Sequence, residues 1–339
     1  MISIGCWNTW GLNSLRKQLA IQKWIQMNNL HFVGLIETKT QPEKLAILMH
    51  KLGLQGWSTL ANSAVTQPSR IMVSWNPHTH SIQEIDQSSQ WITCSATNKA
   101  TKTSLTITVV YGLNSPSERI PLWNYIQNQG SIITNPWIIL GDFNAIMHPW
   151  NRAGGTTAWP RHMEDFPESI SKAELIHLPY TGPNLTWHNG QVNGRNIQKK
   201  LDWAFGNHTL LQSWPATRVN FQPRLISDHS GMFVHIQPHL IKAAPPIFKF
   251  INAWADRADF MATVEGVWQN PIRGNPMFIL TSKLQILRTV LKKYHKQNTS
   301  AISTRVNEAK QNWKISQYNL DLSPTDPIRI QNERHCAAA

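Results

Sequence analysis

The sequence predicts an α+β fold in which two mostly antiparallel sheets pack as a sandwich with helices outside. Short apolar runs of strand length follow one another closely, and only a few segments with helical spacing interrupt them. The chain contains no G-x-G-x-x-G sequence and no regular strand–helix alternation, which disfavours a doubly wound parallel sheet. Hydrophobic residues make up 41% of the 339 residues, enough for a packed core, so a wholly disordered chain is excluded.

The first half of the chain supplies most of the predicted strands. Apolar runs predict strands at 2–7, 31–36, 71–75, 81–85, 91–96, 105–111 and 137–144. Ser14 is expected to cap a helix in which Ile21, Trp24 and Ile25 share one face. A second helix is predicted at 116–129, between the last two of these strands. The first half of the chain is therefore expected to consist of short strands in hairpins, interrupted by a few helices.

The second half is expected to complete the sandwich and then to leave it. A helix is predicted at 163–176 and strands at 185–187, 201–205 and 233–236. Pro245-Pro246 predicts a boundary, which gives a domain at 1–241 and a basic, mostly helical extension at 242–339. One helix of the extension carries an apolar seam at 4-3-4-3 spacing, and a docking face is favoured over a coiled coil. Its members are Leu280, Leu284, Leu287, Leu291 and Tyr294.

The charge of the chain favours a polyanionic partner. The formal net charge is +13 with a pI near 9.8, and residues 242–339 hold 14 of the 32 basic and 7 of the 19 acidic side chains. Nucleic acid is the first expectation, anionic membrane the second, and solubility alone the remaining explanation. The three widely spaced cysteines indicate a reducing compartment. Without a long apolar run or a signal-like N-terminus, a soluble, unsecreted protein is expected.

A candidate site begins at Gly141-Asp142-Phe143-Asn144, which follows the apolar run 137–140. Side chains two apart on an extended chain point to the same side, so Asp142 and Asn144 are able to reach one bound group. The Asp could orient a proton and the Asn could donate to an oxyanion. By themselves these four residues favour an Asx turn that closes a strand, and the rest of the chain reverses that preference.

Polar residues at the ends of other predicted strands strengthen the hypothesis of a shared site. A single carboxylate in such a position, such as Glu37, is either a surface residue or a ligand for a hard metal ion. Several of them together are more specific than any one. The full set is Asn8, Glu37, Tyr111, Asp142, Asn144, Asp202, Asp228 and His229.

These residues stand in motifs that resemble the endonuclease/exonuclease/phosphatase superfamily of metal-dependent phosphoesterases. The motifs occur in order through residues 1–236 as W-N-x-x-G-L from Trp7, L-I-E-T-K from Leu35, V-Y-G, G-D-F-N, T-W, L-D and S-D-H-S. The stretch P-W-I-I-L-G-D-F-N and the F-I-N-A-W sequence at 250–254 resemble the endonuclease of plant LINE-type retrotransposons. The resemblance implies a DNase I-like sandwich and, because a reverse transcriptase follows in that family, a truncated or domesticated element with part of a linker.

The resemblance also implies a role for each site residue. Glu37, with Asn8 and Asp228, would hold Mg²⁺, with Mn²⁺ as the alternative, and Asp142 would deprotonate the attacking water. Asn144 and His229 would donate to phosphoryl oxygens, Asp202 would fix the His229 tautomer, and Tyr111 would contact the phosphate or the leaving group. DNA contacts are expected from the hairpin between predicted strands, at Thr186, Arg195, Lys199 and Lys200.

The leading hypothesis is a Mg²⁺-dependent endonuclease that nicks DNA and leaves a 3′-hydroxyl. The alternatives are a decayed relic that binds nucleic acid without cutting it, and a small-molecule or RNA phosphoesterase of the same fold. Trp10 and Trp203 stand where relatives carry polar residues, which favours the relic. DNA is the expected partner, with the element's RNA second and neither a membrane nor a small-molecule cofactor expected. A nuclear location is expected from the family, otherwise a cytoplasmic one.

Overall fold

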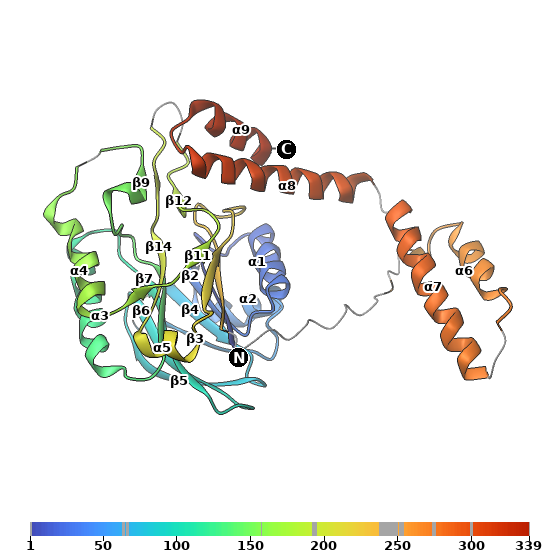
Figure 1. Ribbon diagram of the computed structural model, residues 1–339, viewed down its shortest axis with the longest axis horizontal. Coiled ribbons are helices and arrows are strands. Elements are labelled where there is room, and N and C mark those ends of the chain that lie inside the picture. The colour runs from blue at the N-terminus through green and yellow to red at the C-terminus, as the bar shows by residue number, and fades with distance from the viewer. Residues whose placement is uncertain are drawn as a thin grey trace. The chain divides into compact units, whose positions relative to one another are not determined.

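A computed structural model describes residues 2–62, 65, 68–156, 158–191, 195–236, 250, 254–272, 276–298 and 301–338. The chain divides into two compact units, each described here by itself. The first unit comprises Met1–His239 together with Trp313–Ala339, and the second comprises Leu240–Asn312. The first unit contains two large sheets packed face to face, with helices on their outer sides (Figure 1). The predicted two-sheet sandwich is therefore confirmed.

One sheet has seven strands and contains both the first and the last strand of the sandwich. Their order is β11-β15-β16-β1-β2-β4-β3, in which β1–β2 and β11–β15 are parallel pairs and the other pairs are antiparallel. The bounds are β1 Ile2–Asn8, β2 Phe32–Thr40, β3 Ser58–Ala61, β4 Ser69–Trp75, β11 Tyr180–Thr181, β15 Arg218–Phe221 and β16 Met232–Ile236.

The opposite sheet has six strands in the order β10-β14-β8-β7-β6-β5. Only its β7–β8 pair is parallel, so the expectation of mostly antiparallel sheets holds for both. The bounds are β5 His80–Gln87, β6 Trp91–Asn98, β7 Ser104–Tyr111, β8 Trp137–Asp142, β10 Ile176–His177 and β14 Asp202–Gly206. A third, small sheet joins β9 Arg152–Ala153, β12 Trp187–His188 and β13 Gln198–Lys199.

The main hydrophobic core lies between the two large sheets, where apolar side chains from both inner faces meet. The sheets approach so closely that a Cβ atom on Gly34 of β2 would lie 2.9 Å from two methyl groups of Val109 on β7. Glycine therefore fits at position 34, where a larger residue would require Val109 or the backbone to shift.

Two helix pairs bury the outer faces of the sheets. Helices α1 Leu15–Met27 and α2 Leu45–Lys51 pack on the seven-stranded sheet through Trp24, Ile25 and Leu48. Helices α3 Ile120–Ile132 and α4 Asp165–Lys172 pack on the six-stranded sheet, where Phe166 contacts Trp123 and Phe143. Figure 1 shows these pairs on opposite sides of the sandwich, with the short helix α5 His208–Ser213 near its lower edge.

The local signals predicted the first helix well and the later ones less well. Ser14 caps α1 as expected, because its side chain accepts a hydrogen bond from the N–H of Lys17. The second helix begins at Ile120 after a 3₁₀ turn over Ser117–Arg119, later than the predicted start. The sequence analysis did not predict β3, β15, α2 or α5, which are short and carry weak periodicity.

The C-terminal segment corrects the predicted division at residues 241 and 242. Helix α8 Ala301–Leu322 enters the first unit at Trp313, and α9 Pro327–Ala338 lies wholly within it. The Asp321 carboxylate accepts hydrogen bonds from the N–H groups of Asn184 and Leu185, both at 2.8 Å. The carbonyl of Pro324 accepts from the side chains of Asn196 and Gln198. The segment 313–339 therefore belongs to the first unit, since it satisfies polar groups of the β12–β13 hairpin region.

The second unit is a small helical body. Helices α6 Phe260–Trp268 and α7 Pro276–Asn298 pack through Phe260, Leu291 and Tyr294 around Trp254. The predicted apolar seam on α7 is thus buried at its C-terminal end, whereas Leu280 and Leu284 remain 43% and 48% exposed. The Pro245-Pro246 pair and residues 251–253 of the F-I-N-A-W sequence lie outside the described residues. Within the part of the chain described, no helix combines the length and the apolar character needed to cross a membrane.

Candidate active site

Strand register brings the predicted polar residues to one end of the sandwich. Asp142, the last residue of β8, lies opposite Asp202 at the start of antiparallel β14 and beside Tyr111 at the end of parallel β7. In the facing sheet, the parallel pair β1–β2 delivers Asn8 at its end and Glu37 just beyond Ile36. Because parallel strands end at the same edge, residues far apart in the sequence meet there.

Asp142 is at the centre of this cluster and is completely buried. Its Oδ1 accepts a hydrogen bond from the N–H of Asn144 at 2.9 Å, and its Oδ2 accepts one from Asn8 Nδ2 at 2.9 Å. His229 Nε2 lies 3.6 Å from the same Oδ2. Burial, with the negative charge of Asp202, raises the pKa of Asp142 to about 7, although His229 opposes this rise. A carboxylate with such a pKa is suited to exchange a proton near neutral pH.

His229 is held between two carboxylates. Its Nδ1 lies 3.0 Å and 3.2 Å from the two oxygens of Asp202, on the side of the ring opposite the nitrogen that faces Asp142. Burial by itself would lower the pKa of His229, but Asp202 and Asp142 outweigh it and raise the pKa to about 10. The imidazole is therefore protonated at neutral pH and carries a fixed positive charge.

Asp142, Asp202 and His229 also place one ligand atom each within 4.8 Å of one another, a spacing that a metal ion could use. A protonated imidazole has no free lone pair, however, and both of its nitrogens already face carboxylates. In this structure the two carboxylates hold the ring of His229 in one orientation.

Glu37 is the carboxylate best placed for a hard cation. Its Oε1 accepts from Asn8 Nδ2 at 3.1 Å, its Oε2 lies 3.5 Å from Lys39 Nζ, and its side chain is 17% exposed. A partly exposed carboxylate suits Mg²⁺, because that ion keeps several waters and takes one or two carboxylates. Glu37 thus offers one carboxylate oxygen ligand to a divalent ion.

The other two predicted metal ligands have different partners here. The Asn8 side chain donates to Glu37 and Asp142, while its Oδ1 accepts from the N–H of Trp10 at 3.0 Å. Asp228 accepts from Trp187 Nε1 at 2.9 Å and from Ser227 Oγ at 3.2 Å. Asn8 and Asp228 therefore act as orienting residues in this structure, and their role as ligands stays a prediction.

Asn144 and Tyr111 lie at the rim of the same cluster. Asn144 has φ of 49° and donates from Nδ2 to the carbonyl of Gly112 at 2.7 Å, which holds the turn after β8. Burial raises the pKa of Tyr111, and the charge of Glu37 and a hydrogen bond with it act in the same direction. Tyr111 therefore stays protonated and is able to donate a hydrogen bond.

Two of the four predicted DNA contacts need correction. Thr186 is completely buried, and its Oγ1 accepts from the N–H groups of Leu201 and Asp202, so it anchors the strand that carries Asp202. Lys200 is 1% exposed, and its Nζ lies 3.8 Å, 4.2 Å and 4.9 Å from the ring centres of Tyr180, Phe221 and Trp203. Neither side chain is accessible to DNA, because the hairpin turns them into the unit.

The remaining two contacts keep accessible positions. Arg195 is exposed, and Lys199 is half-buried with its Nζ 5.6 Å from the ring centre of Trp187. A further hollow of about 200 Å³ lies beside Asn144 and is lined by Lys199, Arg119 and Arg152 among other residues. Basic side chains thus adjoin the catalytic cluster, and their contact with DNA stays a prediction.

Ser227, the first residue of the S-D-H-S motif, is a site residue that was not predicted from the sequence. Ser227 Oγ is near three groups of the site, because it donates to the carbonyl of Asn8 at 2.7 Å and contacts the side chain of Asp228 and the N–H of His229. It ties the loop before β16 to the end of β1. The position of Ser227 within the S-D-H-S motif was the sequence signal that could have identified it.

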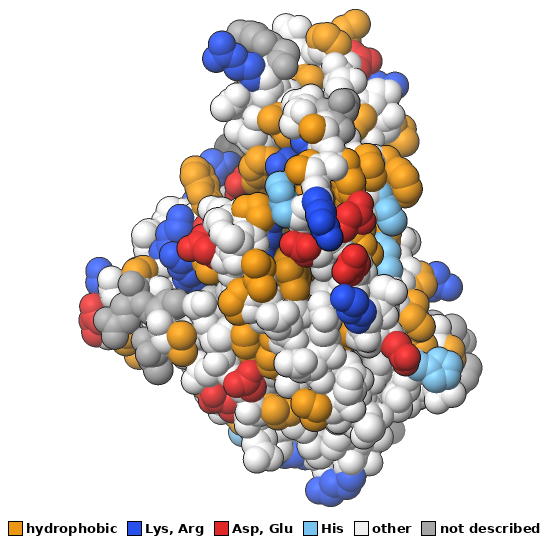
Figure 2. Space-filling view, turned by 90° about the vertical axis from the view of Figure 1, so that its left-hand side faces the viewer, with side chains coloured by type: hydrophobic (Ala, Val, Ile, Leu, Met, Phe, Trp, Pro, Cys, Tyr) orange, Lys and Arg blue, Asp and Glu red, His pale blue; other side chains and the backbone are white. Residues whose placement is uncertain are grey.

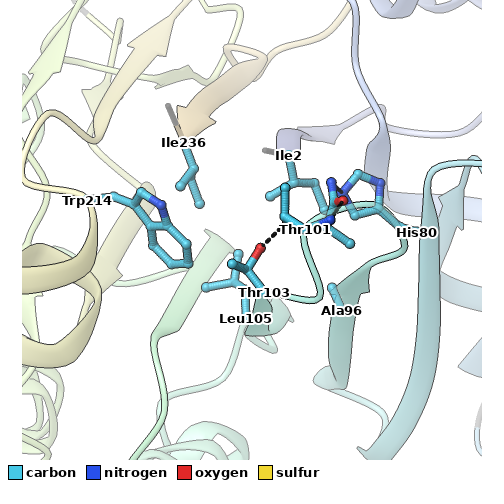
Figure 3. A pocket seen from close by; sticks show the side chains of 9 residues that line it. Ile2, His80, Ala96, Thr101, Thr103, Leu105, Trp214 and Ile236 are labelled. Atoms are coloured by element: carbon cyan, nitrogen blue, oxygen red, sulfur yellow. Dashed lines mark hydrogen bonds between the residues drawn. The ribbon is translucent and has the colours of Figure 1, made fainter. Parts of the chain in front are cut away.

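A second hollow lies far from the cluster around Asp142. A cavity of about 160 Å³ is lined by Ile2 at the start of β1 and Ile236 at the end of β16, with Trp214 and Leu105 between the sheets (Figure 3). The strand β1 separates it from Asn8 by roughly 20 Å, at about 3.3 Å per residue. The cavity is mostly apolar and adjoins the core, so it is not part of the candidate active site.

Basic side chains are not confined to one area of the surface. On the face drawn in Figure 2, Lys and Arg side chains occur in several separate places, with acidic and hydrophobic side chains between them. The net charge of +13 therefore does not by itself locate a binding surface, and the basic residues near Asp142 have to be considered one at a time.

Comparisons with known proteins agree with this geometry. The sequence model of the Endonuclease/Exonuclease/phosphatase family matches residues 5–229. The endonuclease domain of TRAS1, a telomere-specific non-LTR retrotransposon, is 15% identical, with a TM-score of 0.52 over 70% of this chain and 99% of that one. The AP endonuclease LMAP from Leishmania major is 16% identical, with a TM-score of 0.56 over 69% and 86%. These similarities show the fold; among curated protein sequences, no match is found.

Proposed function

The chain belongs to the endonuclease/exonuclease/phosphatase family, and we propose that it is an endonuclease that nicks DNA and leaves a 3′-hydroxyl. The observation that carries the proposal is the buried sequence of contacts Asn8–Asp142–His229–Asp202 at one end of the sandwich. These residues pair a carboxylate poised near pH 7 with a fixed imidazolium, which are the groups that phosphodiester hydrolysis by water requires.

Each side chain has a defined task in this proposal. Asp142 takes a proton from the attacking water, and Asn8 and the N–H of Asn144 hold its carboxylate in one orientation. His229 donates to a nonbridging oxygen as negative charge builds up there, and Asp202 keeps the ring positioned and charged. The phosphorus–oxygen bond to the 3′ oxygen then breaks and that oxygen takes up a proton from solvent, so the nick ends in a 3′-hydroxyl and a 5′-phosphate.

A divalent ion is part of the proposal. Glu37 would hold it, with Asn8 and Asp228 as the expected further ligands, and Mg²⁺ is the expected ion with Mn²⁺ as the alternative, since oxygen donors suit both. When bound, such an ion neutralises charge on phosphoryl oxygens and on the leaving oxygen.

Support for DNA as the substrate comes from charge and from the structural similarities. The chain is strongly basic, whereas a small-molecule phosphatase gains little from a net charge of +13. Two structures of the same fold are named as a retrotransposon endonuclease domain and an AP endonuclease. These points favour DNA over inositol phosphates, sphingomyelin or RNA tails.

One of the two sequence departures that favoured a relic has a structural explanation. Trp203 is buried in β14, donates from Nε1 to the carbonyl of Ala145 at 3.0 Å and packs against Phe205. It supports the strand that carries Asp202 instead of disrupting the cluster. A binding relic therefore remains the alternative that an activity assay has to test.

The experiment is a nicking assay with supercoiled plasmid and the full chain. We expect conversion to the open circular form with Mg²⁺, none with EDTA, and extension of the nick by a DNA polymerase without prior phosphatase treatment. Binding of plasmid without nicking in Mg²⁺ or Mn²⁺ would establish the relic instead. Hydrolysis of small phosphate esters with intact plasmid would establish the third alternative.

A further inference from the structure

Trp10 is an exposed aromatic side chain attached directly to the catalytic cluster. It is the second residue after β1 and is 61% exposed, although relatives usually carry a polar residue at this position. Its N–H donates to Asn8 Oδ1 at 3.0 Å, and the N–H of the next residue, Gly11, donates to the carbonyl of Glu37 at 2.8 Å. The backbone of this turn is therefore tied to two residues of the proposed site.

The turn holds Trp10 in an unfavourable backbone conformation. Its φ is 46°, in the left-handed region that a bulky side chain rarely adopts. Lys17 Nζ stabilises the turn by donating to the carbonyls of Thr9 and Trp10 at 2.7 Å and 2.8 Å. Such strain persists only where the surroundings fix it, and it is common at functional sites. The ring is thus presented to solvent in a fixed place at a cost in local stability.

Two ammonium groups flank this ring. Lys17 Nζ lies 5.3 Å and Lys39 Nζ 5.9 Å from its centre, and Lys39 also approaches Glu37 at 3.5 Å. An aromatic face combined with neighbouring cations is how proteins hold a nucleobase and its adjoining phosphates. The arrangement therefore has the chemistry of a nucleotide contact, next to the carboxylate expected to hold the metal.

We propose that Trp10 stacks on a nucleobase beside the scissile phosphate, with Lys17 and Lys39 facing the adjoining phosphates. This inference rests on the proposed function, because it assigns the ring a place in the same DNA complex. To stack on Trp10, a base must first separate in part from its neighbours in the duplex. Flexible base-pair steps such as TA or CA/TG are therefore the expected binding positions. Trp10 is then a positioning residue that helps to select the nicking site.

The test measures DNA binding by the full chain in EDTA, where no cleavage occurs. Each duplex oligonucleotide in a set carries 2-aminopurine at a different position, and the fluorescence of this base analogue reports how it is stacked. When wild type binds, we expect the fluorescence to change for one or two adjacent positions. This change should be lost in Trp10→Ala and Trp10→Gly. Gly accepts the positive φ, so Trp10→Gly is expected to fold at least as stably as wild type.

The expected loss of affinity is about 5- to 150-fold, the range of base–aromatic stacking energies, while Trp10→Phe keeps most of it. The slope of log K against log salt should not change, because the ring neutralises no phosphate. Trp268→Ala is the matched control, since Trp268 is also exposed, at 42%, and has Lys283 Nζ 5.6 Å from its ring centre, but lies in the second unit. It should leave the fluorescence change intact.

The outcomes separate the two proposals. Equal binding and fluorescence in wild type and Trp10→Gly would overturn the stacking contact while leaving nicking untouched. A Trp10-dependent signal in a chain that fails to nick plasmid would support the contact and overturn the endonuclease. A chain that binds none of the oligonucleotides would overturn the stacking contact as well.

Discussion

The first unit buries charged side chains in two places, at the cluster of Asp142, Asp202 and His229 and at Lys200, and their surroundings differ. Asp142, Asp202 and His229 form hydrogen bonds or close ion pairs with one another at the end of the sandwich. Lys200, two residues before Asp202, is equally buried, but its Nζ faces three aromatic rings, and no hydrogen bond to it occurs among the described residues.

The two places differ in how the cost of burying a charge is compensated. In the catalytic cluster, opposite charges compensate burial, so His229 stays protonated and Asp142 titrates near neutral pH. At Lys200, burial dominates and lowers the pKa to about 7, although Asp202 and Asp321 oppose it. The aromatic faces attract the ammonium form but cannot replace its hydration. The cluster therefore keeps its charges paired, whereas the charge of Lys200 costs stability.

The largest effect is expected from Asp142→Asn. The amide cannot accept the water's proton, so nicking should fall by about 10²–10⁴-fold with the melting temperature nearly unchanged. Plasmid nicking and thermal melting check this, with Asp256→Asn, an exposed residue of the second unit, as the control. Nicking at the wild-type rate would remove Asp142 from the reaction.

Asp202→Asn should have a smaller effect of the same kind, about 10- to 100-fold on nicking. Asp202 acts through His229, and the loss of its charge lowers the pKa of that imidazole. Because His229 must be protonated to donate, the alkaline limb of the pH–rate profile should move to lower pH. An unshifted profile would show that Asp202 has only a structural role.

Lys200→Met should stabilise the fold and leave nicking within a few-fold of wild type. The folded pKa of about 7 lies below the ordinary 10.5, so between these values the unfolded state binds more protons. Wild-type stability should therefore rise with pH across this window, and the variant should lack that rise and gain on the order of a few kcal/mol at its lower end.

Urea titrations at both ends of the window measure this difference. Lys199→Met is the matched control, because Lys199 is adjacent but half-buried at the hairpin. It should weaken DNA binding without stabilising the fold. A loss of stability in Lys200→Met would mean that the aromatic faces favour the ammonium more strongly than burial opposes it.

The smallest effect is expected from Asp321→Ala, which tests whether the C-terminal segment belongs to this charge system. The change removes a carboxylate that caps the N–H groups of Asn184 and Leu185 and supports the charge of Lys200. A loss of about 1–3 kcal/mol in the free energy of unfolding is expected. Asp321→Asn, which keeps one acceptor oxygen, should lose less, and hydrogen exchange at 184–200 should rise in step. Unchanged exchange there would separate the segment from the hairpin.

The sequence could predict that the candidate site residues lie at strand ends because the signals for that position are local. Asp142, Asn8 and Glu37 each follow an apolar run that reads as a strand, and their motifs occur in family order. The hairpin assignments for Thr186 and Lys200 were wrong for the opposite reason. Inward and outward positions alternate along a strand, and in two-residue strands such as β12 and β13 no pattern shows which side is which.

By itself, the sequence determined the sandwich class, the family and the eight polar positions, since hydrophobic period and motif order are written along the chain. Only the tertiary structure decided that segment 313–339 completes the first unit, that Lys200 is enclosed by aromatic rings, and that Trp10 is exposed beside Asn8. These facts depend on contacts between residues far apart in sequence, such as Asp321 with Asn184, which no local pattern encodes. Burial is a property of the folded arrangement, and so are the pKa values that follow from it.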